Sequence, residues 1–472
     1  MRGPGEALGR IAECVPRPAT RALAPTISNA GLQAFGLLRN RPLQSTAMAT
    51  APALTWADRL LGGRLWRHRD FVKLWIGQGI SEAGSQVTFL ALPTAAILLL
   101  HAGPFEVGLL GALEFLPFPT LGLIAGVYAD RIRRRPIMIV CDAGRAVLLA
   151  SIPIAWLLGS LTMPQLYAVS LLMGIGTVFF DVSYQSYLPA LIERRDLVEG
   201  NSKLEVSRSV AALAGPAIAG FLIQLAGAAQ AMWADAASFA VSVATLLGIR
   251  KPEPPPAPGT EAGRTGFFHE MWEGIGVVFG NPTLWKIAGC TATSNLGSNM
   301  IFAVFLIFVY RQLHLSPGVV GVVFAIAAVG GLTGAVMAGT IARRVGLGLT
   351  LLLAVAVGGG VWGLVPLARY GAAVPLLLVA GFVAFFTEPL YNINQVSLRQ
   401  AITPDRVQGR MNATMRTIVW GTIPIGSFLG GVLGSFLGVV PTLWIGIVIA
   451  TLAAGWILAG PVRLREQSAA VS

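Results

Sequence analysis

The sequence predicts an all-α membrane protein with twelve transmembrane helices in two six-helix bundles. Of its 472 residues, 54% are hydrophobic and only 12% are charged, about half the charged fraction of a soluble protein. Twelve apolar segments are long enough to cross a bilayer, which takes about 20 helical residues. The second half of the chain repeats features of the first, which favours two bundles related by duplication.

Residues 1–70 precede the first apolar segment, and we expect them to form a disordered cytoplasmic tail. The first 47 residues carry six arginines and two acids. Such a composition is typical of an organelle presequence. The favoured interpretation is instead that the protein starts at Met48.

The apolar segments predict the membrane spans. They occupy residues 74–100, 105–129, 137–158, 163–185, 206–226, 229–249, 284–309, 318–341, 347–368, 373–396, 413–436 and 440–461. The first six give an N-terminal bundle at 71–249 and the last six a C-terminal bundle at 284–462. A cytoplasmic tail follows at 463–472.

The distribution of cations predicts the orientation. Loops assigned to one face carry twenty Lys and Arg residues, and those of the other face carry only Arg311 and Arg369. Cytoplasmic loops are the ones enriched in Lys and Arg. Both termini are therefore predicted to be cytoplasmic.

Residues 250–283 form the longest internal connection and are predicted to be cytoplasmic. The segment opens Lys-Pro-Glu-Pro-Pro-Pro, a stiff spacer. Residues 267–279 then read as a short helix lying in the headgroup region.

The internal repeat pairs an acid and a tyrosine in each half. Residues of the first half match residues of the second at an offset of 207: Leu171, Gly174, Asp181 and Tyr184 with Leu378, Gly381, Glu388 and Tyr391. Parallel repeats of this kind place the substrate site near the bilayer midplane, between the bundles.

The loop at 126–136, Gly-Val-Tyr-Ala-Asp-Arg-Ile-Arg-Arg-Arg-Pro, joins the second and third spans. Its acid and four arginines cannot lie in hydrocarbon. The loop resembles the signature between helices 2 and 3 of the major facilitator superfamily, although Arg133 replaces the usual second glycine. The resemblance implies a cytoplasmic latch that clamps two helices and releases them when the transporter changes state.

We expect this latch to consist of Asp130, Arg131, Arg134, Asp142 and Arg145, with Asp130 also capping the third helix. Asp142 and Arg145 lie three residues apart and can meet on one helix face. Asp181 and Glu388 occupy equivalent inner positions in helices 4 and 10 and are predicted to belong to the same cytoplasmic gate. An ordinary interfacial ion pair without a gating role is the alternative.

Two further acids lie within the spans. Glu82 and Glu114 have no Lys or Arg at matching depth in their own helices, so they are candidates for proton coupling. The alternative is a protonated carboxyl hydrogen-bonded to a neighbouring helix. Asp235 lies only six residues into the sixth span, where we expect it to reach external water.

The fifth span contains Gly215, Pro216 and Gly220. The segment resembles the Gly-Pro-x-x-Gly-Gly motif of antiporter-type exporters in the same superfamily, with Ala219 as a departure. The proline bends the helix, and small residues let a neighbour approach closely.

Candidate cavity residues come from helices 7 and 2. Asn295 and Asn299 fall four apart on one face, and amides in a bilayer either join helices or contact substrate. Phe115 and Phe118 are candidates for an apolar wall, although phenylalanine is common in any membrane core.

Residues 142–146, 180–192 and 196–205 are similar to the macrolide-efflux and enterobactin-exporter branch of the superfamily. They read Asp-Ala-Gly-Arg-Ala, Phe-Asp-Val-Ser-Tyr-Gln-Ser-Tyr-Leu-Pro-Ala-Leu-Ile and Asp-Leu-Val-Glu-Gly-Asn-Ser-Lys-Leu-Glu. The resemblance implies a monomer in a bacterial plasma membrane that exports a drug, antibiotic or metabolite in exchange for protons. An importer or facilitator is the alternative, followed by a non-transporting membrane sensor.

Other classes find no support in the sequence. Three cysteines and four histidines are scattered without ligand spacing, so no metal is expected. No phosphate-binding loop or nucleophile motif occurs, so we expect neither a cofactor nor an enzyme. The net charge of +12 is spread over short loops, which argues against a nucleic-acid partner.

Overall fold

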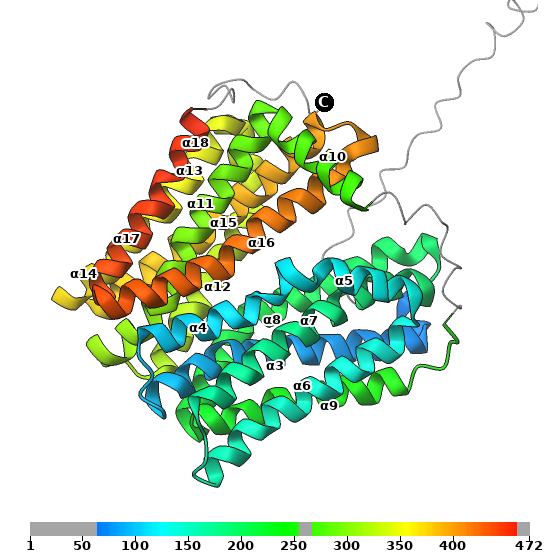
Figure 1. Cartoon of the computed structure of the whole chain (residues 1–472), viewed down its shortest axis with the longest axis horizontal. Helices are drawn as coiled ribbons and strands as arrows, with labels where there is room; N and C mark the ends of the chain where they lie inside the picture. The colour runs from blue at the N-terminus through cyan, green and yellow to red at the C-terminus, as the bar shows by residue number, and fades with distance from the viewer. Residues whose placement is uncertain (1–63, 254–266, 460–472) are drawn as a thin grey trace, which may run out of the picture. The chain divides into compact units, whose positions relative to one another are not determined.

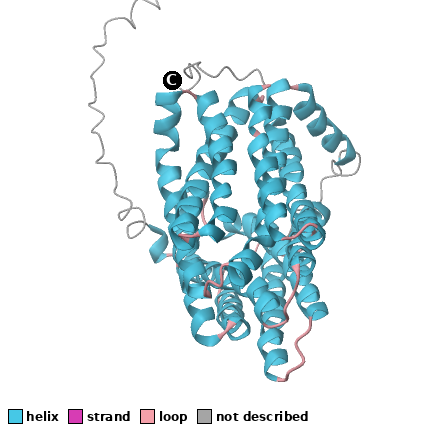
Figure 2. Ribbon diagram, turned by 90° about the vertical axis from the view of Figure 1, so that its left-hand side faces the viewer, coloured by secondary structure: helices cyan, strands magenta, loops and turns pink. Residues whose placement is uncertain are grey.

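The computed structural model describes residues 64–253 and 267–459 (Figure 1). The described residues are mostly helical and contain no strand, with short loops between the helices (Figure 2). Residues 1–63, the proposed start at Met48, the proline-rich spacer at 254–266 and the tail from residue 460 lie outside the described part.

Helices occur where spans are predicted. They are α3 (Arg69–Leu98), α4 (Pro104–Phe115), α5 (Pro117–Arg131), α6 (Arg134–Leu157), α7 (Met163–Leu191), α8 (Leu197–Ala226), α9 (Ala228–Leu247), α11 (Pro282–Ile307), α12 (Pro317–Val345), α13 (Leu347–Gly360), α14 (Leu364–Leu367), α15 (Ala373–Ile402), α16 (Asp405–Phe436), α17 (Val439–Leu452) and α18 (Ala454–Leu458). Short 3-10 helices η5 (Val361–Gly363) and η6 (Ala368–Tyr370) flank α14, and the π-helix η4 (Phe308–Gln312) extends α11.

Nine helical segments in the described ranges are long and apolar enough to cross a membrane. The other predicted spans carry features that weaken the signal. In α3 these are polar residues such as Ser81, Glu82 and Gln86, and in α9 they include Asp235. The second predicted span is divided into α4 and α5 at Pro117, since proline cannot donate a backbone hydrogen bond.

The part of the predicted tail that the structure describes is ordered. Arg64–Arg67 form the 3-10 helix η1, and the His68 side chain accepts a hydrogen bond from the amide of Phe71 at the start of α3. Trp66 packs edge-on against Trp75, with ring centroids 4.8 Å apart. Leu65 is buried in a cluster with Phe71 and Leu74, so residues 64–70 are ordered, contrary to the prediction.

Most packing lies within two groups of helices, α3 to α9 and α11 to α18 (Figure 1). Glycines permit close approach in both. In the first group, a Cβ at Gly84 of α3 would lie 2.5 Å from the Asp235 carboxylate of α9. In the second, a Cβ at Gly334 of α12 would lie 2.1 Å from the Phe386 carbonyl oxygen of α15.

The two groups meet where the connection at residues 99–103 lies, which we call the 99–103 end. There α4 contacts α16, and α8 contacts α12. A Cβ at Gly108 would lie 2.6 Å from the Gly431 Cα, and one at Gly220 would lie 2.7 Å from the Gly321 Cα. Backbones this close leave no room for side chains between them.

Polar contacts join the groups at the same end. The hydroxyls of Thr94 and Tyr310 are 3.0 Å apart. Arg311 of η4 donates to the Ile97 carbonyl over 3.2 Å, and the Phe105 amide donates to the Ser435 hydroxyl over 3.0 Å. These bonds add directional contacts to the glycine packing.

At the opposite end, near residues 132–133, the signature loop is less tightly packed against its neighbours. Arg131 and Arg133 are exposed, and among the described residues no atom lies within 4 Å of a Cβ placed at Gly122 or Gly126. The contacts that join the two groups are therefore concentrated at the 99–103 end.

The predicted interfacial helix is α10 (Phe267–Gly280). It packs on α16, where Glu273 forms ion pairs with Arg406 and Arg410. Gly274 lets the helices touch, because a Cβ there would lie 2.8 Å from the Arg410 carbonyl. The helix therefore docks on a neighbour through one face, and Trp272 stays exposed.

Candidate functional site

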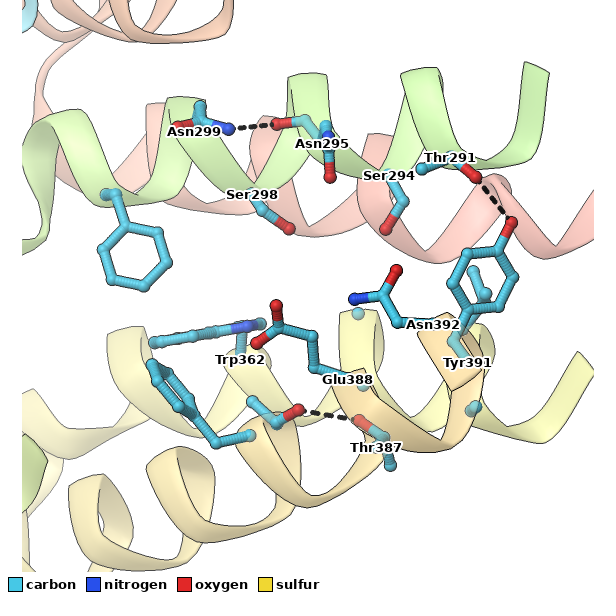
Figure 3. Close-up of a pocket in the computed structure, with 17 residues that line it drawn as sticks. Thr291, Ser294, Asn295, Ser298, Asn299, Trp362, Thr387, Glu388, Tyr391 and Asn392 are labelled. Atoms are coloured by element: carbon cyan, nitrogen blue, oxygen red, sulfur yellow. Dashed lines mark hydrogen bonds between the residues drawn. The ribbon is translucent and has the colours of Figure 1, made fainter. Parts of the chain in front are cut away.

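A cavity of about 250 Å³ opens between α11, α13, η5 and α15 (Figure 3). Polar residues line it from both α11 and α15. The polar residues are Thr291, Ser294, Asn295, Ser298, Asn299, Thr387, Glu388, Tyr391 and Asn392.

Aromatic rings form another part of the lining. Phe302, Trp362 and Phe385 contribute to it. The Trp362 and Phe302 rings meet edge-to-face, with centroids 5.4 Å apart, an arrangement that aromatic pairs prefer. The cavity therefore offers hydrogen-bonding groups and aromatic rings together.

The two asparagines of the seventh predicted span, which is α11, lie where substrate contacts are predicted. Asn295 and Asn299 both line the cavity from α11. The Asn295 side chain donates to the Val419 carbonyl of α16 over 3.3 Å, and Asn299 donates to the Asn295 carbonyl over 2.8 Å. The amides thus join helices as well as line the cavity, which were the two alternatives.

Glu388 lies on this cavity and is exposed to it. No described residue donates a hydrogen bond to its carboxylate or forms an ion pair with it, and the seventeen lining residues include no Lys, Arg or His. Figure 3 shows the carboxyl directed into the space between α11 and α15, beside Trp362 and Asn392. The sequence predicts a gate residue here, whereas the structure gives it no gate partner.

The repeat-related acid Asp181 has different surroundings. It lies in α7 with three arginines near it, Arg145, Arg208 and Arg416, and with the acid Glu82 near it as well. No described residue forms an ion pair or a hydrogen bond with its carboxylate. Nearby, Asp142 and Arg145 of α6 form the ion pair that their spacing predicts. Asp142 also accepts a hydrogen bond from Ser242 of α9 over 2.5 Å.

Aromatic rings enclose the Arg145 guanidinium. It lies 4.6 Å from the ring centroid of Phe180 and 4.3 Å from that of Phe239. Arg145 and Asp142 are 6% and 0% exposed. The pair is therefore fixed from three helices, α6, α7 and α9.

The predicted latch is not one cluster. Arg134 pairs with Glu253, at 3.7 Å, instead of joining Asp142 and Arg145. Glu253 also caps α6, because its carboxylate accepts the amides of Arg134 and Arg135 at 2.7 and 3.1 Å. The expectation that Asp130 lies beside these residues and caps this helix cannot be followed, since its side chain is outside the described part.

The signature loop alone does not predict the contact with Glu253, because Glu253 lies at the start of the linker, far away in the sequence. The sequence signal for it is an acid a few residues after the end of α9, in Lys-Pro-Glu. Arg135 strengthens the same junction by donating to the carbonyls of Leu246 and Leu247 at the end of α9. A cation at these carbonyls also suits the helix dipole.

The proton-coupling candidates lie away from the cavity lining. Glu82 accepts a hydrogen bond from Gln78 over 3.2 Å within α3. Glu114 of α4 has no hydrogen-bond partner among the described residues. Asp235 does not reach external water as predicted, because it is fully buried and bonded to the hydroxyls of Thr88 and Ser238.

The Gly-Pro motif of the fifth predicted span, which is α8, contacts both groups of helices. Gly215 faces α3, where a Cβ would lie 2.5 Å from the Gln86 side chain, and Gly220 faces α12 at the 99–103 end. Pro216 is buried within α8. Gly215 and Gly220 thus allow the close helix approaches that the motif predicts.

Phe115 and Phe118 do not line the cavity. Phe118 packs against Trp420 of α16, with ring centroids 4.7 Å apart, and Phe115 packs against Phe118. This aromatic contact joins the two groups of helices farther from the 99–103 end.

Comparison with known proteins gives matches over most of the chain. The profile of a family described as transmembrane secretion effector matches residues 65–472. The multidrug efflux pump Tap of Mycolicibacterium fortuitum is 26% identical over 395 residues, 81% of this chain and 93% of its own length. The enterobactin exporter EntS of Citrobacter koseri is 24% identical, over 78% of this chain and 86% of its own.

Solved structures share the fold. A bacterial homologue of the iron transporter ferroportin in an inward-facing state superposes with a TM-score of 0.68 at 16% identity, covering 84% of this chain and 99% of its own. A structure described as such a homologue in an outward-facing state gives 0.52 at 18% identity, covering 83% and 98%.

Proposed function

Because the chain belongs to the transmembrane secretion effector family of the major facilitator superfamily, we propose that it exports amphipathic small molecules. In this proposal it is a secondary active transporter in a bacterial plasma membrane. It acts as a monomer, with twelve spans in two six-helix bundles and both termini in the cytoplasm. The substrate is a drug, an antibiotic or a natural-product metabolite.

The observation that carries the proposal is the cavity on α11, α13 and α15. Its lining combines hydroxyls, amides and a carboxylate with aromatic rings. A site that holds an amphipathic molecule needs both kinds of surface, with polar groups that fix the orientation of the molecule.

Alternating access accounts for the distribution of contacts. The 99–103 end is assigned to the outside of the cell, where Gly108–Gly431 and Gly220–Gly321 close the path between the bundles. The basic signature loop then faces the cytoplasm. The greater likeness to an inward-facing relative than to an outward-facing one agrees with an open cytoplasmic side.

The inner gate is assigned to the region between the two groups of helices at residues 117–135 and the start of α16. Arg131 is exposed there, whereas Arg134 forms an ion pair with Glu253. Asp142, Arg145 and Asp181 form the fixed base of this gate. Its closure would bring the signature loop toward α16.

Export is driven by proton entry, with Glu82 or Glu114 as the carrier. Neither carboxylate has an ion-pair partner among the described residues. A carboxyl in such surroundings exchanges a proton more readily than one fixed by an arginine.

The second candidate is an importer or facilitator, because alternating access works in either direction. A nucleoside transporter shares the fold, with a TM-score of 0.65 at 12% identity. The efflux-named relatives and the helix-5 motif favour export. A non-transporting sensor is the third candidate, and any substrate movement by purified protein excludes it.

The test uses everted membrane vesicles that carry an imposed acid-inside gradient. Addition of an exported compound should release protons from the lumen while the compound accumulates there. Glu82→Gln or Glu114→Gln should abolish the proton release, whereas Glu193→Gln, in an exposed ion pair, should not. Undiminished pH-driven export by both variants contradicts the carrier assignment, and accumulation only in intact cells favours import.

A further inference from the structure

Glu388 is the only charged residue among the seventeen that line the cavity within the described ranges. Its neighbours on the lining supply amide and hydroxyl groups or aromatic rings. A bound molecule would therefore meet one negative charge and no compensating positive charge.

The carboxylate has no protein partner to neutralise it. No described residue donates a hydrogen bond to it, and no cation lies close enough to pair with it. Asp181, at the repeat-related position, has Arg145, Arg208 and Arg416 near it, together with the acid Glu82. An unpaired carboxylate in a membrane protein is costly and is seldom kept without a partner or a function.

The apolar side of the cavity suits a cation as well. Trp362 is 7% exposed and is held edge-to-face by Phe302 and by Phe305, at 5.4 and 6.0 Å between ring centroids. Tryptophan is the aromatic residue that attracts a cation most strongly. Figure 3 shows Trp362 and Glu388 beside one another on the same wall of the cavity.

We propose that this cavity binds small organic cations, with the cationic amine at Glu388 and the planar apolar part against Trp362 and Phe302. The proposal rests on the export function above and names the class of substrate. Asn295, Asn299 and Asn392 supply the remaining hydrogen bonds, so cations that carry hydroxyl or carbonyl groups bind better than bare hydrocarbons.

The assignment also fixes what the site rejects. Anions meet the Glu388 carboxylate with no Lys, Arg or His on the lining to offset it. Neutral molecules of the same shape keep the aromatic contact but leave the carboxylate unpaired. Discrimination therefore follows charge first and shape second.

The test measures equilibrium binding to the purified full-length protein in lipid nanodiscs by calorimetry. Three probes share an indole ring and differ in charge: tryptamine is a cation, tryptophol is neutral and indole-3-acetate is an anion. A charge-assisted contact predicts that tryptamine binds about tenfold to hundredfold more tightly than tryptophol. Indole-3-acetate should bind most weakly.

Variants separate the charge from the shape of the cavity. Glu388→Gln should abolish the preference for tryptamine over tryptophol, and Glu388→Asp should keep most of it. Glu193→Gln removes an exposed carboxylate that is paired with Arg195 and should leave the preference unchanged. Unfolding temperatures of all variants show whether each protein is intact.

Three results would overturn the assignment: equal binding of the three probes, no binding of any, or a cation preference that survives in Glu388→Gln. The export assay distinguishes failure of the function from failure of the site. Export of neutral or anionic compounds alone would keep the exporter and reject the cation site. Cation binding that needs Glu388, without transport of any compound, would keep the site and reject the exporter.

Discussion

The two halves of the chain treat a repeat-related acid in opposite ways. In the first half, Asp181 lies near arginines, and the adjacent Asp142 and Arg145 form a buried pair. In the second half, Glu388 faces a cavity without a cationic partner. The internal repeat predicted matching positions and did not predict that only one of the two acids would have arginines near it.

The helix that faces each acid-bearing helix explains the difference. In the first half, α6 places Arg145 over the Phe180 ring of α7. In the second half, α13 approaches α15 through Gly358, where a Cβ would lie 2.4 Å from the Thr387 hydroxyl. A long cationic side chain occupies one helix pair, whereas a glycine leaves the other pair without one. The same scaffold can therefore serve structure in one half and binding in the other.

The largest effect on stability is expected from breaking the buried ion pair of Asp142 and Arg145 in the first half. Asp142→Asn should leave the Arg145 charge buried and uncompensated, which costs about 3–5 kcal/mol of unfolding free energy. A large drop in the thermal unfolding temperature in nanodiscs would be the measurement. Arg145→Met added to Asp142→Asn should recover part of the loss.

An exposed pair at the same spacing provides the control. Arg208 and Glu205 are three residues apart, with side chains 63% and 60% exposed. Glu205→Gln should cost less than about 1 kcal/mol, because such pairs are solvated and screened. Equal losses for Glu205→Gln and Asp142→Asn would show that burial does not distinguish the two pairs.

How far the sequence could predict this comparison depends on the kind of information needed. The spans, and the ion pair of Asp142 with Arg145, follow from local apolar runs and helix periodicity. Asn295 and Asn299 were also placed on the cavity through their spacing. The surroundings of Glu388 were not predictable, because they depend on how closely α13 approaches α15.

Long-range partners were missed for the same reason. Glu253 caps α6 from a segment more than a hundred residues away, and nothing in the signature loop points to it. Asp235 was placed in water by its depth, yet Thr88 and Ser238 supply its hydrogen bonds. Trp362 gave no sequence signal that set it apart from other membrane tryptophans.

Gly358, at the contact of α13 with α15, offers the next test. Gly358→Ala should force the Thr387 hydroxyl from its hydrogen bond with the Ala384 carbonyl, which is 2.8 Å long. Overpacking of this kind costs about 1–3 kcal/mol, measurable as a lower unfolding temperature. Thr387→Ala in the same protein should relieve the clash. Gly455→Ala, where a Cβ meets no atom of the described residues within 4 Å, should not destabilise.

A smaller effect is expected at the aromatic wall. Trp362→Leu keeps an apolar side chain but removes the ring face, which contributes about 0.5–2 kcal/mol to cation binding. Tryptamine affinity should therefore fall by about 2-fold to 30-fold, and tryptophol affinity should fall less. Calorimetry with both probes measures the difference, and equal losses would assign Trp362 to packing alone.

The smallest effect on stability is expected at Glu388 itself, although its effect on binding is large. Glu388→Gln removes a charge that no described residue pairs with, so no partner is left uncompensated. The unfolding temperature should therefore stay unchanged or rise, in contrast to the drop for Asp142→Asn. Both variants replace one carboxylate oxygen by an amide NH2 group, so the chemical change is the same at the two positions. A drop at Glu388 as large as at Asp142 would mean that this acid also holds the fold together, and the division of roles between the halves would fail.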